Sequence, residues 1–143
     1  MSLHYPHAHP PENGSLIEVA TGVFWVRMPL PFQLNHINLW LLRDGDGWVI
    51  VDTGFPDDAV RETWTKIIDV LDGPVKRLIV THFHPDHLGL ATWLMEKTGA
   101  PLSMTTGEFL TAHAVWHEFG GHGARFMVEQ FRQHGLGADL LAK

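Results

Sequence analysis

The alternation of strand-like and helix-like segments between residues 16 and 104 constrains the fold more than any other feature of the chain. Two apolar runs, one ending at Leu42 and one ending at Asp52, flank a glycine-containing turn and predict a β-hairpin. Two shorter β-branched and aromatic runs between residues 16 and 28 predict a pair of strands before it. We therefore expect the sheet to begin as an antiparallel one.

Helices and strands alternate after this hairpin. Apolar side chains repeat at helical spacing over residues 60–71, which predicts an amphipathic helix that covers the sheet. Residues 76–81 are typical of a buried strand, residues 88–97 of a second helix and residues 101–104 of a short strand. The order β, α, β, α, β indicates a layered α/β architecture.

Composition divides the chain into three parts. Residues 1–14 combine histidines with prolines and predict a flexible tail, whereas residues 15–104 hold the strand and helix pattern. Residues 105–143 carry no strand pattern. They predict a helix that begins with a capping box, followed by helical stretches over residues 124–134 and 138–142.

The net charge and the absence of cysteine exclude several classes of protein. A formal net charge of -6 leaves no basic surface for nucleic acid or for anionic membranes. No apolar run is long enough to cross a bilayer and no signal peptide is evident, so we expect a soluble, cytoplasmic protein. Without cysteine, a bound metal must be held by histidine and carboxylate side chains.

Three histidines and an aspartate lie within six consecutive positions directly after the predicted strand over residues 76–81. His82 and His84 are two residues apart, so in an extended chain both imidazoles project the same way, toward one cation. Asp86 and His87 follow in the predicted first turn of the next helix, where they would serve a second cation beside the first. Imidazole and carboxylate ligands suit zinc, and equally iron or manganese.

This loop resembles the His-x-His-x-Asp-His signature of the metallo-β-lactamase superfamily. The resemblance extends from about residue 17 to about residue 102 and includes Asp52, in an Asp-Thr-Gly element at a strand end. It implies the N-terminal half of an αβ/βα sandwich: a mostly antiparallel mixed sheet with helices on one face, followed by a helical segment. By the same comparison His82 and His84 bind the first metal, and Asp86 and His87 bind the second.

The resemblance also implies a reaction. One or two zinc ions would lower the pKa of a bound water toward neutrality, and the resulting hydroxide would attack a small ester, thioester or lactone. Asp86 would orient that hydroxide and carry a proton to the leaving group. For Asp52 two interpretations stay open: it orients a ligand imidazole through the other ring nitrogen, or it caps the loop that follows it. The resemblance also implies that loops on the side of His36 and Asn38 can border the substrate, although turn hydrogen bonding is the preferred interpretation of these two residues.

Members of this superfamily normally add a third histidine, a bridging aspartate and a further histidine from later in the chain. His122, in a Gly-His-Gly turn, is the candidate for the third ligand, although such a turn is commonly structural. We therefore expect a truncated half domain. The alternatives are a catalytically inactive fragment or interaction module, or an iron-dependent oxidoreductase relative. A sheet without its second layer also predicts self-association through the exposed face.

Overall fold

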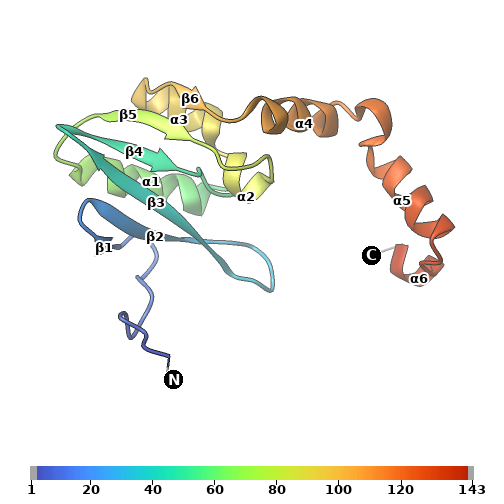
Figure 1. Cartoon of the computed structure of the whole chain (residues 1–143), viewed down its shortest axis with the longest axis horizontal. Coiled ribbons are helices and arrows are strands. Elements are labelled where there is room, and N and C mark those ends of the chain that lie inside the picture. The colour runs from blue at the N-terminus through green and yellow to red at the C-terminus, as the bar shows by residue number, and fades with distance from the viewer. Residues whose placement is uncertain (1–2, 142–143) are drawn as a thin grey trace. The chain divides into compact units, whose positions relative to one another are not determined.

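The computed structural model describes residues 3–141, and the chain forms two compact units, Met1–Met104 and Thr105–Lys143. The first unit contains most of the secondary structure (Figure 1). Its elements are β1 (Leu16–Ala20), β2 (Val23–Pro29), β3 (His36–Asp44), β4 (Gly47–Val51), α1 (Asp58–Val70), β5 (Val75–Ile79), α2 (Pro85–Leu88), α3 (Ala91–Thr98) and β6 (Leu102–Ser103).

A single six-stranded sheet organises the first unit, with the strands in the order β1-β2-β3-β4-β5-β6. Strands β1 to β4 pair antiparallel because short turns join them, and Gly45 supplies the positive φ of +60° in the turn between β3 and β4. Strands β4, β5 and β6 pair parallel because helices make the crossovers between them. The predicted mixed and mostly antiparallel sheet is therefore confirmed.

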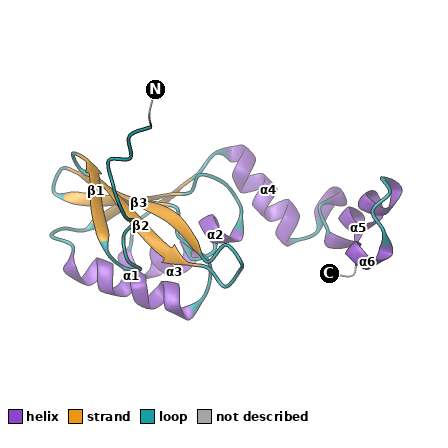
Figure 2. Ribbon diagram, turned by 90° about the horizontal axis from the view of Figure 1, so that it is seen from below, coloured by secondary structure: helices purple, strands orange, loops and turns teal. Residues whose placement is uncertain are grey.

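The hydrophobic core lies on one face of this sheet, beneath α1 and α3 (Figure 2). Alternate side chains of β2, β3 and β4 point into it, as the two-residue period of a strand requires. Strand β5 contributes Val75 and Leu78, on either side of a register shift in its pairing with β4. The apolar stripe predicted over residues 60–71 supplies the helical side of the same core. The core side chains with the lowest exposure are Val26, Met28, Leu39, Leu41, Ile50, Val60, Trp64, Ile67, Leu78, Leu90 and Leu94.

The opposite face of the sheet carries a cross-strand row of apolar side chains. Trp25 pairs with Trp40, Trp40 with Val51, and Val51 with Ile79. All four are half-buried. The N-terminal segment reaches this face at His7, whose ring centroid lies 6.5 Å from that of Trp25.

The helix predicted over residues 88–97 is wrong in its extent, because two helices, α2 and α3, occupy this region. The break falls at Gly89 and Leu90. The backbone N–H of Leu90 donates to the hydroxyl of Thr53, at 3.1 Å, and not to a carbonyl of the preceding turn. A tertiary hydrogen bond thus interrupts a pattern that is typical of one continuous helix.

Helices joined by short turns make up the described residues of the second unit, and none of these residues forms a strand. Its elements are α4 (Thr106–Trp116), η1 (Phe119–Gly121), α5 (Ala124–Gln133) and α6 (Ala138–Leu141). Thr105 caps α4 by accepting the backbone N–H of Glu108, at 3.3 Å, as the capping box predicts. Residue 142 of the last predicted helix and residues 1–2 of the predicted tail lie outside the described residues. Among the described residues, no helix is both long and apolar enough to cross a membrane.

Candidate metal centre

The candidate ligands lie in the loop that follows β5, beside the loop that follows β4. Since β4 and β5 are parallel neighbours, their carboxyl ends meet at one edge of the sheet. The backbone N–H of Asp52 donates to the carbonyl oxygen of Ile79, at 2.8 Å, which continues the ladder to the end of both strands. Asp52 is therefore held directly under the histidine loop.

The three histidines of this loop converge. His82 Nε2 and His84 Nδ1 are 3.1 Å apart, and the ring centroids of His82 and His87 are 3.8 Å apart. On the other side, His87 Nε2 lies 3.6 Å from Asp86 Oδ2. The structure thus brings the predicted ligands together as two pairs of donor atoms.

Helix α2 presents Asp86 and His87 to the site. Pro85 occupies its first turn, where a missing backbone N–H costs nothing, and the backbone N–H of His87 donates to the carbonyl of His84 at 2.9 Å. Thr53 fixes the helix from below, because its backbone N–H and its hydroxyl both donate to the carbonyl oxygen of His87, each at 2.7 Å. These bonds set the height of α2 above the sheet.

The Asp52 carboxylate is the polar centre beneath the loop. Only 4% of the residue is exposed, and its backbone adopts φ +63°, a left-handed conformation that aspartate tolerates better than most residues. It accepts the backbone N–H of Thr81 at 2.7 Å, the hydroxyl of Thr81 at 2.8 Å and Nδ1 of His87 at 2.8 Å. The contact with His87 corresponds to the first interpretation made from the sequence, that Asp52 orients a ligand imidazole. The loop that Asp52 caps is the one after β5, through Thr81, and not the loop that follows Asp52 in the chain.

The electrostatics of the loop favour neutral imidazole at His82. Burial lowers the pKa of His82 below its ordinary value, and the neighbouring His87 and His84 lower it further. A neutral imidazole has a free lone pair on one ring nitrogen. Histidine binds metal ions in this neutral form.

The distance between the candidate ligand atoms can be compared with the distance between ligands of a zinc ion. Within residues 3–141, no group of three or more histidine, cysteine, aspartate or glutamate side chains is arranged to hold one metal ion. Two nitrogens bound to a tetrahedral zinc ion at about 2.0–2.1 Å lie about 3.3 Å apart, which is close to the 3.1 Å between His82 Nε2 and His84 Nδ1. The His82–His84 pair therefore has the spacing expected of two ligands of one such ion.

His122 belongs to the second unit. It is exposed and ends the short helix η1, where its backbone N–H donates to the carbonyl of Phe119 at 3.0 Å. This is the geometry of a turn residue, and its assignment as a third ligand stays a prediction.

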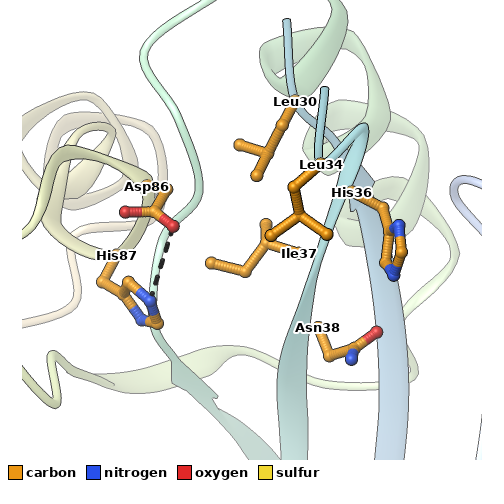
Figure 3. Close-up of a pocket in the computed structure, with 7 residues that line it drawn as sticks. All are labelled: Leu30, Leu34, His36, Ile37, Asn38, Asp86 and His87. Atoms are coloured by element: carbon orange, nitrogen blue, oxygen red, sulfur yellow. Dashed lines mark ion pairs between the residues drawn. The ribbon is translucent and has the colours of Figure 1, made fainter. Parts of the chain in front are cut away.

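A pocket of about 350 Å³ opens beside Asp86 and His87 (Figure 3). Leu30, Leu34 and Ile37 face this pair across the pocket and come from β3 and the loop before it. The pocket is also lined by His36 and Asn38.

The sequence favoured turn hydrogen bonding for His36 and Asn38 over a place beside the substrate, and no motif in it singled out the leucines or Thr81. Asn38 Oδ1 accepts Nε1–H of Trp25 at 2.8 Å, so its amide is held in one orientation. One feature of the sequence could have indicated that these leucines line a pocket. The segment of residues 29–35 connects two strands and is nevertheless largely apolar.

Known proteins resemble this chain over the same region. A family model described as the metallo-β-lactamase superfamily matches residues 33–129. The crystal structure of a β-lactamase domain protein from Burkholderia ambifaria is 48% identical with a TM-score of 0.70, and the match covers 83% of this chain and 40% of that one. A metallo-β-lactamase family protein from Thermus thermophilus is 30% identical with a TM-score of 0.68, covering 82% of this chain and 40% of that one.

A curated relative gives the same result at the level of sequence. The probable metallo-hydrolase YybB of Bacillus subtilis (strain 168) is 33% identical over 92 residues, which are 62% of this chain and 39% of that protein. The chain thus spans about two fifths of the length of these relatives. The family model covers well over half of the chain, and so the chain belongs to the metallo-β-lactamase superfamily.

Proposed function

We propose that this chain contributes part of the metal-binding site of a hydrolase that acts on a small ester, thioester or lactone. The observation that carries the proposal is the convergence of two donor pairs, His82 with His84 and Asp86 with His87, over the buried carboxylate of Asp52. The named relative from Bacillus, a probable metallo-hydrolase, supports the reaction class.

Zinc is the proposed metal, in one or two ions. His82 Nε2 and His84 Nδ1 would hold the first, and Asp86 Oδ2 and His87 Nε2 the second. When bound, such ions activate water and polarise the carbonyl oxygen of a substrate. The donors are nitrogen and oxygen only, which also suits iron and manganese.

Asp86 is the proposed proton carrier. Its side chain is about one third exposed and lines the pocket, so a carboxylate oxygen faces the space where a substrate would lie. From there it can accept a proton from the attacking water and deliver it to the leaving group.

The pocket supports a small and partly apolar substrate. Its volume of about 350 Å³ is at the lower end of the range for small-molecule sites, and Leu30, Leu34 and Ile37 form its apolar wall. An ester or lactone has a neutral carbonyl with an attached apolar group. The apolar group would contact the leucines and Ile37, and the carbonyl would lie near Asp86 and His87.

Metal content and hydrolysis test the proposal together. Protein purified without added metal should contain about two equivalents of zinc per chain and should hydrolyse a small ester, with activity lost to a chelator. His84→Ala should weaken metal binding by more than the roughly 10–100-fold typical of losing an outer-shell partner. His113→Ala, which removes a histidine from the second unit, is the matched control and should keep both properties.

Two other outcomes would reject the proposal. Less than one equivalent of metal without hydrolysis would establish a catalytically inactive fragment or interaction module. Bound iron with its characteristic absorption, together with oxygen-dependent turnover, would establish an oxidoreductase.

A further inference from the structure

The hydroxyl of Thr81 lies between the buried carboxylate and the first candidate ligand. Thr81 Oγ1 is 2.8 Å from Asp52 Oδ2 and 3.0 Å from Asp52 Oδ1. The same oxygen is 3.0 Å from His82 Nδ1. One hydroxyl therefore contacts both groups at hydrogen-bonding distance.

The direction of these hydrogen bonds follows from the number of protons available. An ionised carboxylate only accepts, and a threonine hydroxyl has one proton to donate. That proton therefore points to Asp52, and Thr81 Oγ1 must accept from His82 Nδ1–H. The proton of a neutral His82 then lies on Nδ1, which leaves the lone pair on Nε2, the atom that faces His84.

His87 is oriented by the same carboxylate directly. Its Nδ1 lies 2.8 Å from Asp52 Oδ2 and donates to it, so its lone pair lies on Nε2. That atom faces Asp86 Oδ2 at 3.6 Å. One carboxylate thus contacts one imidazole directly and a second one through a hydroxyl.

We propose that Thr81 is a positioning residue that relays the orientation imposed by Asp52 to His82, so that one buried carboxylate sets the tautomer of an imidazole in each donor pair. Its relevance to metal binding rests on the proposed function. Outer-shell partners of this kind fix the ring orientation and the tautomer of ligand histidines, and their loss costs metal affinity.

The tautomer of His82 in metal-free protein tests the relay without any metal. Proton–nitrogen NMR of isotope-labelled histidine should place the proton of neutral His82 on Nδ1 in the wild type. In Thr81→Val the hydroxyl is lost, and His82 should move toward the Nε2–H form. His87 is an internal control, because its own bond to Asp52 does not involve Thr81, and its Nδ1–H form should persist.

The Thr81→Val variant should fold. Thr81 is exposed, and its backbone N–H, which donates to Asp52 Oδ1 at 2.7 Å, does not depend on the side chain. Thr81→Ser restores a hydroxyl and should restore the wild-type tautomer. Thr65→Val is the matched control, because Thr65 donates its hydroxyl to a helix carbonyl at Arg61 and lies outside the loop.

Metal affinity provides the second measurement. Titration with cobalt, followed by its visible absorption, should show binding weakened about 10–100-fold in Thr81→Val and unchanged in Thr65→Val. Thr81→Ser should stay close to wild type.

Two results would overturn the relay: a wild-type His82 that carries its proton on Nε2, or a tautomer that is the same in wild type and Thr81→Val. Both of these results come from NMR of metal-free protein, so this failure is separate from that of the proposed function. A wild-type protein that binds no metal but shows Nδ1–H at His82 would defeat the hydrolase proposal and support the relay.

Discussion

Gly54 and Gly89 form a close junction under the histidine loop. Gly54 has φ +89°, and a Cβ atom there would lie 2.7 Å from Val60 Cγ1. A Cβ atom on Gly89 would lie 2.3 Å from the carbonyl oxygen of Pro85 and 3.0 Å from that of Gly54. The loops after β4 and β5 can approach this closely only because both positions lack a side chain.

Gly89→Ala should therefore destabilise the first unit. We expect a loss of about 1–3 kcal/mol in the free energy of unfolding, because the methyl group forces the backbone at Pro85 to move. Urea unfolding measures it. Gly107→Ala is the control, since a Cβ atom at this helical position meets nothing within 4 Å and alanine favours a helix. Equal stability of Gly89→Ala and wild type would contradict the close approach.

The candidate ligands could be identified from the sequence, whereas the residue that contacts His82 from the side of Asp52 could not. His82, His84, Asp86 and His87 are neighbours in the chain, so a local motif was enough to select them. Thr81 acquires its partner only when β4 and β5 align, because Asp52 lies 29 positions earlier. A contact of that range depends on strand register, and no local pattern encodes it.

At the scale of elements, an ion pair joins the β3–β4 hairpin to the end of α1. Arg43 donates to both carboxylate oxygens of Asp72, at 2.8 and 2.6 Å, and its guanidinium lies 4.6 Å from the ring centroid of Trp48. Trp48 Nε1–H also donates to Asp72, at 3.2 Å. The hydrogen bonds from Arg43 are the main reason that the pKa of Asp72 is lowered.

The contribution of Asp72 to stability should depend on pH in a defined direction. Its pKa is lower in the folded state than in the unfolded state, so the stabilisation is present at neutral pH and is lost as the pH falls through the folded value. Asp72→Asn should thus be less stable than wild type at neutral pH, and the difference should shrink below about pH 4.

Urea unfolding of both proteins across this pH range measures the effect. Asp69→Asn, on the exposed side of α1, is the control and should show a smaller difference at neutral pH. A difference between Asp72→Asn and wild type that grows as the pH falls would contradict the ion pair as the cause.

A helix or strand could be predicted where the spacing of its apolar residues fits only one type of secondary structure. Helix α1 follows the apolar repeat over residues 60–71, and β5 follows the apolar run that ends before Thr81. The boundary between α2 and α3 was not predictable, because it depends on the hydrogen bond from Leu90 to Thr53, residues that are 37 positions apart. Local propensity is overridden there by a tertiary contact.

At the scale of the whole molecule, the row of Trp25, Trp40, Val51 and Ile79 leaves an apolar sheet face only half-buried. We expect this chain to self-associate through that face at high concentration, because contiguous apolar surface of this kind favours contacts between copies. Size-exclusion chromatography with light scattering measures it. Trp40→Gln should weaken association, whereas Val70→Gln, an exposed position at the end of α1, should not.

A clean monomer that binds no hydrophobic dye would refute this expectation. The apolar residues of the predicted strands suggested a sheet face available for self-association, which stays a prediction. The sequence could not predict which residues pair across this face, since the row of four depends on the registers between β2, β3, β4 and β5.

The strand order of the sheet has a consequence for how the first unit folds. Each strand from β2 to β6 pairs with the strand that precedes it in the sequence, so its partner has already been synthesised. Folds with short sequence separation between contacts fold faster, because less loop-closure entropy opposes each contact. The strand order therefore allows β1 to β4 to pair with one another before the histidine loop is added to the sheet.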